Sequence, residues 1–339
     1  MKSWKRYLKT FLKQVMNEIK KRNFLVSKEV EENLENVIQS KLFSNGYIFY
    51  GPEGIGKKQA ALNFITDIFK NYESCSNVEQ KIKDNNHPDF LLIEPTYIVQ
   101  GKLINQSDSE LTKNKNKQTI RIDQIRNIKQ FLGRKSIESE KKIILIVDAH
   151  LLNEAASNCL LKTLEEPTNG IFILLTSRIN VLIDTIISRC QLVRFKPFSF
   201  KEIKNFIEEN LESKDFFLKK EKDWQYLINS SNGSPLKTLE NIEIWEEIPK
   251  DIRDIFEFPI NDNLEILKIA KFISETLENH KQIVLINLIQ YKWWGQTKEI
   301  KIIKELESLK KYINGYVQPR LAWEVTLLKI ANMLVHSSV

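Results

Sequence analysis

The sequence predicts a parallel α/β domain in the N-terminal half of the chain and an all-α region after it. Short apolar runs of strand length alternate with helical patterns at 122–132, 153–165 and 180–187, which is typical of a parallel sheet covered on both faces. Beyond Pro197 the strand-like runs disappear, and amphipathic helical patterns fill 200–339. The apolar runs lie at 47–50, 90–93, 143–147, 171–175 and 191–195.

Size and composition exclude several classes of protein. With 339 residues, 42% of them hydrophobic, the chain is long enough for two or three domains. No run approaches the roughly 18 apolar residues that a membrane span requires, and charges interrupt the first residues too often for a signal peptide. Cys75, Cys159 and Cys190 are too few for a disulfide framework, so we expect a protein of the reducing cytoplasm.

The net charge of +7 is concentrated in the first residues of the chain. Residues 1–22 hold eight basic side chains and one acidic one, and the rest of the chain holds 43 of each. The body is therefore neutral, which argues against a broad DNA-binding field. Residues 1–22 have the pattern of an amphipathic helix. It either docks on its own body with its lysines in water or contacts nucleic acid or another acidic surface.

We expect four segments along the chain. They are the basic helix 1–23, the α/β domain 24–197, a small helical domain 198–246 and a second helical domain 247–339. Polar residues at 72–86 and 96–118 are interpreted as surface segments. Helix breaks are expected near Ser231–Pro235, Pro249, Pro259, Gly295 and Pro319.

A glycine-rich loop follows the first apolar run and precedes a helical pattern at 57–71. Its residues are Gly51-Pro52-Glu53-Gly54-Ile55-Gly56-Lys57-Lys58. Gly51, Gly54 and Gly56 allow backbone N–H groups to turn around phosphates, and Lys57 can reach the terminal phosphates. The pattern normally ends in Ser or Thr, whose hydroxyl binds magnesium, whereas an ammonium cannot coordinate a cation. Lys58 therefore predicts a phosphate-binding loop without the metal half of its site.

The second nucleotide-binding element is also incomplete. Asp148 directly follows the run 143–147. The next residue is Ala149, in place of the Glu that would act on the attacking water. His150 is interpreted as a residue at a helix start rather than as a substitute base. Thr176 is a polar residue at the carboxyl end of the run 171–175, where ligands of α/β proteins bind. The two defects together predict a P-loop fold that has lost hydrolysis.

The next helical pattern has clear ends and leads to a short polar motif. Asn153 is the expected N-cap of the helix, and Pro167 is expected to end it. The triplet Ser188-Arg189-Cys190 comes shortly before the last apolar run.

These segments resemble the delta-prime family of the bacterial DNA polymerase III clamp loader, in the AAA+ superfamily. A leucine-rich helix ending in Leu-Glu-Glu-Pro, combined with the triplet Ser-Arg-Cys, is specific to clamp-loader subunits. The His-Pro-Asp stretch and the defective ATP motifs favour delta-prime over the related ATPase subunit. The matching segments, in the order of the family, are Phe49–Lys58, His87–Pro95, Ile122–Arg126, Val147–Pro167, Ser188–Cys190 and Gly233–Pro235.

The resemblance implies a P-loop AAA+ domain followed by a helical lid and a helical collar that mediates oligomerisation. It implies a ring of five subunits in which ATPase (gamma/tau) subunits and delta open the sliding clamp and place it on primer-template DNA. Delta-prime is the stator of that ring. Arg189, between Ser188 and Cys190, corresponds to an arginine finger that stabilises charge in a neighbouring subunit's ATP site.

The resemblance also bears on cofactors and metals. Many relatives carry a four-cysteine zinc module, but Cys75 is the sole cysteine of the corresponding interval, so we expect no zinc or other metal. Lys237 stands where AAA+ proteins often place a sensor arginine, and it lacks the bidentate fork of arginine. No cofactor is required. Residual ATP or ADP binding is retained as an alternative at Gly51, Gly54, Gly56, Lys57, Asp148, Thr176 and Lys237.

Two other functions were weighed against the stator. One is an ATP-hydrolysing motor subunit of the same assembly, which Lys58 and Ala149 argue against. The other is a small-molecule P-loop kinase, which explains neither the triplet Ser188–Cys190 nor the long helical tail.

Overall fold

The chain divides into two compact units, and the boundary along the sequence falls between Pro197 and Phe198. The computed structural model describes residues 26–72, 77–99, 102–105, 118–166, 169–210, 221–248, 256, 262–315 and 317–337. The basic segment 1–23 lies outside these residues, so its helix stays a prediction. None of the helices in the described ranges is long and apolar enough to cross a membrane.

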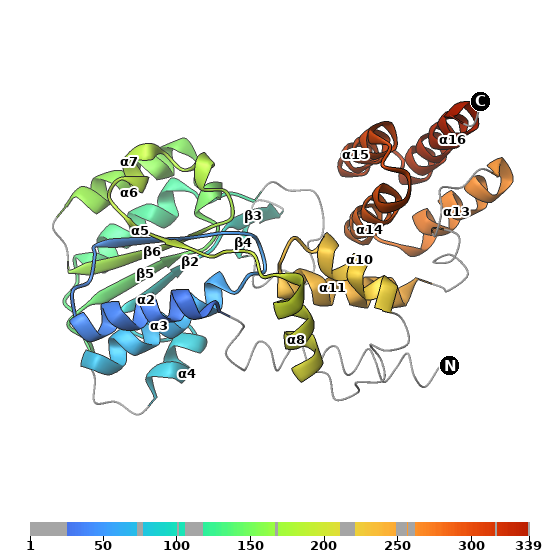
Figure 1. Ribbon diagram of the computed structural model, residues 1–339. Helices are drawn as coiled ribbons and strands as arrows, with labels where there is room; N and C mark the ends of the chain where they lie inside the picture. Colours follow the sequence, from blue (N-terminus) through green and yellow to red (C-terminus); the bar gives the residue numbers. More distant parts are fainter. Residues whose placement is uncertain are drawn as a thin grey trace. The chain divides into compact units, whose positions relative to one another are not determined.

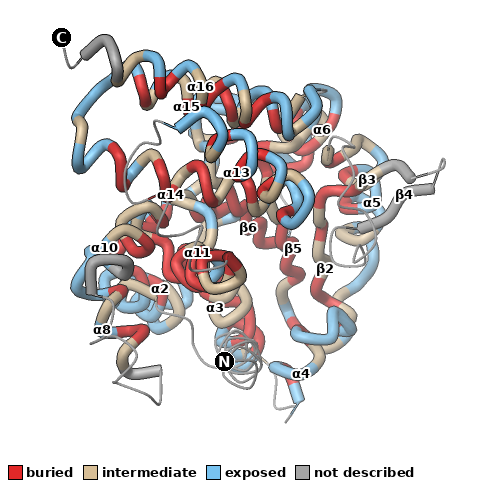
Figure 2. The backbone as a smooth tube through the Cα atoms, turned by 90° about the vertical axis from the view of Figure 1, so that its right-hand side faces the viewer, coloured by how far each residue is buried: buried red, intermediate tan, exposed pale blue. Residues whose placement is uncertain are grey.

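The first unit is built on a five-stranded parallel sheet in the order β2-β5-β6-β1-β7. Every strand forms at an apolar run of the sequence, which confirms the predicted fold class. Residues of β5 and β6 are buried along their whole length, as the red strands in Figure 2 show. The bounds are β1 Gly46–Tyr50, β2 Phe90–Ile93, β5 Lys142–Ile146, β6 Gly170–Thr176 and β7 Gln191–Arg194.

Helices cover both faces of this sheet (Figure 1). Successive residues of a strand point to opposite faces, and β1 illustrates this. Tyr47 and Phe49 pack on Phe64, with ring centroids 5.4 and 6.2 Å away, whereas Ile48 belongs to the core on the other face. One face carries α2 Lys28–Ser40, α3 Lys57–Tyr72 and α4 Val78–Lys83, and the other α5 Ile122–Leu132, α6 Glu154–Glu165 and α7 Asp184–Ile187.

One local prediction for this unit was wrong, and one segment holds strands that were not predicted. The pattern 180–187 is a 3-10 turn, Ile179–Val181, followed by the separate short helix α7. The buried pair Leu182 and Ile186 produced the helical spacing, although Ile183 between them is extended. In the polar segment 96–118, β3 Thr96–Val99 and β4 Lys102–Asn105 form an antiparallel hairpin, since Tyr97, Ile98 and Val99 favour a strand.

The second unit is all-α, as predicted. Ser234 caps α11 by accepting a hydrogen bond from the Lys237 N–H at 3.2 Å, and Pro235 is the first helical residue. The break expected near Gly295 falls slightly later, because α14 runs through Gly295 to Thr297. The helices are α8 Phe200–Asn210, α10 Glu221–Ser230, α11 Pro235–Glu247, α13 Asn263–Thr276, α14 Asn279–Thr297, α15 Ile300–Asn314 and α16 Pro319–Ser337.

A buried lysine connects α14 to α10 and α11. Lys292 is 6% exposed, and its ammonium lies 5.9 Å from the ring centroid of Tyr226 and 5.8 Å from that of Trp245. A cation over aromatic faces is stabilised most strongly when it is shielded from water. The contact thus ties helices of the predicted lid, 198–246, to a helix of the predicted collar, 247–339. The division into lid and collar itself stays a prediction.

Candidate functional site

The glycine loop connects β1 to α3 at the carboxyl edge of the sheet. Gly51, Gly54 and Gly56 have φ values of 155°, 70° and 96°, in a region that side chains other than glycine rarely adopt. A Cβ atom on Gly51 would also lie 2.3 Å from the carbonyl oxygen of Phe195. The loop therefore has the backbone of a phosphate-binding turn and packs closely against the end of β7.

The side chain of Lys57 binds the backbone of this loop. It is the first residue of α3 and is 8% exposed. Its Nζ donates hydrogen bonds to the carbonyl oxygens of Gly51 at 2.7 Å and Pro52 at 2.5 Å. The ammonium is thus held by the loop's own backbone, at the place from which a P-loop lysine would reach a phosphate.

Lys58 occupies the position of the metal-binding hydroxyl and has a partner of opposite charge. Its Nζ lies 2.7 Å from Oε1 of Glu94, whose side chain is 10% exposed. Glu94 directly follows β2 and was missed as a site residue, although it stands in the His87–Pro95 segment at a strand's carboxyl end. An ion-paired ammonium in place of the hydroxyl does not fit Mg²⁺, which requires oxygen ligands.

The remaining predicted residues of the sheet edge come together next to the loop. The Gly51 N–H donates to the carbonyl oxygen of Thr176 at 3.2 Å, and the Thr176 hydroxyl lies 3.4 Å from Nδ1 of His150. Burial raises the pKa of the Asp148 carboxyl, and His150 opposes the rise. Burial likewise lowers the pKa of His150. Ala149 is fully buried and offers no proton acceptor for an attacking water.

Lys237 belongs to the helical unit, in the first turn of α11. Its part in a nucleotide site stays a prediction.

The Ser-Arg-Cys triplet lies at the opposite, amino edge of the same sheet. Arg189 is placed between the end of α7 and the start of β7. Cys190 fits closely against the first residue of β1, because a Cβ atom on Gly46 would lie 2.6 Å from its Sγ. The glycine at position 46 thus lets the triplet sit directly against the central part of the sheet.

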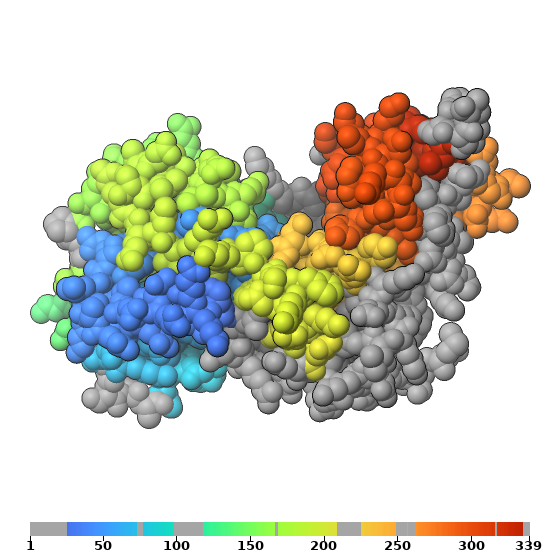
Figure 3. All heavy atoms as spheres, viewed as in Figure 1, coloured from blue at the N-terminus to red at the C-terminus, as the bar shows by residue number. Residues whose placement is uncertain are grey.

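The Arg189 side chain is half exposed and held at two points. Its Nη2 lies 2.8 Å from Oε1 of Glu165, the last residue of α6. Its Nη1 donates to the carbonyl oxygen of Thr185 at 2.9 Å, and the Ser188 hydroxyl donates to the same oxygen at 3.2 Å. The yellow-green segment that includes β7 reaches the surface in Figure 3, above the blue spheres of α2.

Cys190 is expected to resist alkylation in the folded protein. Burial raises the pKa of its thiol to about 11, so about one thiol in 10³ is ionised at pH 8, and the thiolate is the nucleophile. Its labelling by iodoacetamide, followed by mass spectrometry, should therefore be about 100-fold slower in the folded chain than in urea. The folded rate should keep rising with pH up to about 11; a plateau near pH 9 would contradict the burial of the thiol.

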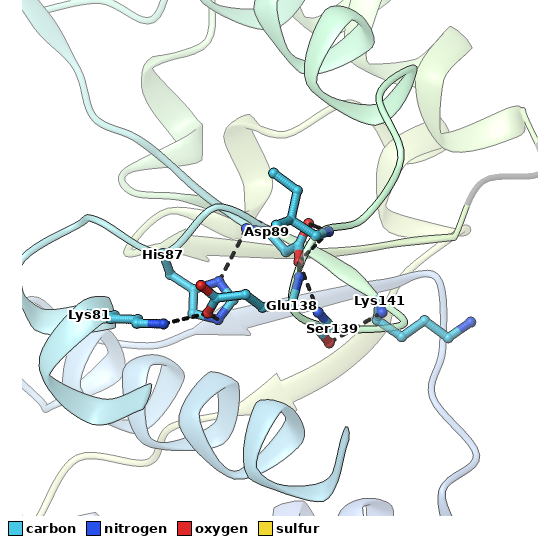
Figure 4. A network of polar contacts seen from close by, with 7 residues as sticks. Lys81, His87, Asp89, Glu138, Ser139 and Lys141 are labelled. Carbon is cyan, nitrogen blue, oxygen red and sulfur yellow. Dashed lines mark hydrogen bonds and ion pairs between the residues drawn. The ribbon is translucent and has the colours of Figure 1, made fainter. Parts of the chain in front are cut away.

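The His-Pro-Asp segment builds a structural network rather than a reactive site (Figure 4). Both carboxylate oxygens of the fully buried Asp89 accept hydrogen bonds, from the N–H groups of Ile137, Glu138 and Ser139 at 2.8–3.0 Å. Nδ1 of His87 accepts from the Asp89 N–H at 3.1 Å, and the imidazole stacks on Phe69. This network fastens the turn before β5 to the start of β2.

No group of three His, Cys, Asp or Glu side chains that could hold a metal ion is present in the part of the chain that the structure describes. Cys75 lies outside that part.

Comparison with known proteins identifies the family. The family model described as "DNA polymerase III, delta subunit" matches residues 26–199, and "Cyanobacterial DNA polymerase III delta prime, C-terminal domain" matches residues 210–330. The chain is 32% identical over 201 residues to the DNA polymerase III subunit delta' of Bacillus subtilis, covering 57% of this chain and 53% of that protein. It is 31% identical over 175 residues to the tau subunit of the same organism, covering 51% of this chain and 28% of tau.

The matches thus span about half the length of the delta' relative and less of tau. A solved gamma subunit-related protein of Thermotoga maritima has a TM-score of 0.52 at 18% identity, covering 88% of this chain and 98% of that one, which shows a shared fold. Because a delta subunit model matches the whole sheet-containing unit and a delta-prime model most of the helical one, the chain belongs to the delta-prime family of DNA polymerase III subunits.

Proposed function

We propose that this protein is a non-motor subunit of a bacterial replicative clamp loader. In this role it joins the ATPase (gamma/tau) subunits and delta in a five-membered ring that places a sliding clamp on primer-template DNA. The ion pair between Lys58 and Glu94 is the observation that carries the proposal. Lys58 stands in place of the metal-binding hydroxyl and is paired with a carboxylate, and the buried Ala149 offers no proton acceptor where the Glu would be.

In this proposal the chain contributes to hydrolysis from its other edge. Arg189 lies at the surface of the sheet-containing unit, and its planar guanidinium suits a phosphate in a neighbouring chain. The helical unit also carries exposed apolar side chains suited to contacts with other subunits, among them Leu321 at 51% and Trp294 at 44% exposure. The chain itself requires no bound nucleotide or zinc.

The test is ATP turnover by the purified chain, alone and mixed with gamma/tau and delta subunits. The chain alone is expected to show no turnover above background, because Lys58 and Ala149 remove the metal ligand and the base. Adding it to the partners is expected to raise their DNA-stimulated hydrolysis. Turnover by the chain alone of about one per second, abolished in Lys57→Ala, would contradict the proposal and favour a motor subunit.

A further inference from the structure

We propose that Glu165 is a positioning residue for Arg189, holding the guanidinium in the orientation in which it meets a neighbour's phosphate. The inference rests on the proposed function of Arg189 and adds to it a residue on another helix. Glu165 is the last residue of α6, and Arg189 follows α7, so the pair joins two helices on the same face of the sheet.

The contacts restrict the guanidinium without using up its donors. A guanidinium has five N–H groups in a planar fork. The carboxylate of Glu165 forms an ion pair with Nη2, at 2.8 Å from Oε1, and the carbonyl oxygen of Thr185 accepts one hydrogen bond from Nη1 at 2.9 Å. Among the residues that the structure describes, these are the partners of the guanidinium, so Nε and the outer N–H groups stay available to phosphate oxygens. Two anchors on different elements fix the plane of the fork, which a single contact would leave free to rotate.

The helix that carries Glu165 is itself firmly placed. Asn153 caps α6 by accepting the Ala156 N–H at 2.8 Å, and Leu160 and Leu164 are buried in the core beneath it. A long arginine side chain loses much rotamer freedom when it binds. Anchoring it before the neighbour arrives lowers that cost, and orientation of a catalytic group is a large part of its effect on rate.

The negative charge of Glu165 does not outweigh this benefit. The side chains of Arg189 and Glu165 are 39% and 46% exposed, so water and salt screen the attraction between them. The carboxylate therefore directs the guanidinium while leaving most of its attraction for a multiply charged phosphate.

The adjacent Glu166 provides a matched control. It has similar exposure, 56%, but its Oε1 pairs with Nζ of Lys129 on α5 at 3.0 Å. Glu165→Ala and Glu166→Ala thus remove the same group from neighbouring positions, and one of them alone affects Arg189. Glu165→Gln keeps an oxygen next to Nη2 and removes the charge.

The experiment measures kcat and KM of DNA-stimulated ATP hydrolysis in the full assembly with gamma/tau and delta subunits. Glu165→Ala should lower kcat at the site next to Arg189 about tenfold, within the range of coupling between contacting side chains, and leave KM unchanged. Glu165→Gln should lose less than about twofold, because its amide oxygen can still accept from the guanidinium. Glu166→Ala should match the unmodified protein, and all variants should assemble normally.

A double-mutant comparison separates this inference from the proposed function. In a chain that already carries Arg189→Ala, the change Glu165→Ala should have no further effect on kcat. If Arg189→Ala slows hydrolysis and Glu165→Ala does not, the positioning role is wrong while the arginine finger stands. If both Glu165 variants raise turnover, Glu165 restrains the guanidinium instead, and the inference is overturned. If Arg189→Ala itself has no effect on kcat, the proposed function of Arg189 is wrong, and the positioning role of Glu165 is wrong with it.

Discussion

Replacing Arg189 with alanine is expected to slow ATP hydrolysis in the adjacent motor subunit by on the order of 10³, the lower end of the range for arginine fingers in GTPases. In the proposed function the guanidinium stabilises charge that develops on the transferred phosphate, and alanine supplies no substitute. The total rate of the assembly should fall less, because its other ATP sites keep their own arginines. Arg189→Lys should recover little, because an ammonium lacks the planar fork.

The measurement is DNA-stimulated hydrolysis and clamp loading by the reconstituted assembly. Arg126 provides the control, since it is also a surface arginine paired with a carboxylate, 3.3 Å from Asp123. Arg126→Ala should leave both rates unchanged, and Arg189→Ala should leave the fold and ring assembly intact. Equal rates for Arg189→Ala and the unmodified protein would reduce Arg189 to an ordinary surface residue.

Replacing Asp89 with alanine is expected to lower the free energy of unfolding by about 3–5 kcal/mol. The change removes both acceptor oxygens from the N–H groups of Ile137, Glu138 and Ser139. These donors lie in a part-buried to buried turn, where unsatisfied N–H groups are costly and hydrogen bonds to a carboxylate are strong. Asp89→Asn should cost less, because its one amide oxygen can still accept from the turn.

Urea denaturation followed by circular dichroism measures the loss. Asp123→Ala is the comparison, because that carboxylate is 77% exposed. Its removal should change the free energy of unfolding by less than about 1 kcal/mol. A similarly small change for Asp89→Ala would show that the turn before β5 does not depend on the carboxylate.

The sheet was predictable because its central strands β5 and β6 are almost entirely apolar runs. Every residue of β5 is buried, and a strand buried on both faces needs no alternation that a helix pattern could imitate. The hairpin β3–β4 was missed because lysine and asparagine flank its short apolar core in an otherwise polar segment. The helix predicted at 180–187 was wrong because apolar spacing suggested more regular structure than is present. Leu182 and Ile186 have helical spacing but belong to different turns.

The residue types of the site were also predictable, but their partners were not. Lys58 and Arg189 stand out within local motifs. Glu94 is 36 positions from Lys58, and Glu165 ends α6, whereas Arg189 follows α7. Such pairs depend on the order of strands and the packing of helices, which no local pattern specifies. The requirement for glycine at position 46 was likewise not predictable. It arises because the side chain of Cys190, just before the neighbouring strand β7, leaves no room for a Cβ atom there.

The placement of the loop and Arg189 at opposite edges of one parallel sheet has a consequence for symmetry. Gly46 and Gly51, at the two ends of β1, adjoin the triplet and the loop respectively. One edge offers an arginine, and the opposite edge would receive one, so subunits that use both edges stack head to tail. Because the two surfaces face in opposite directions, a twofold axis cannot bring each against the other. Heterologous contacts of this kind close into rings or extend into filaments. Under the proposed function, a member with Arg189 at one edge and Lys58 at the other supplies an arginine to one neighbour without using one itself.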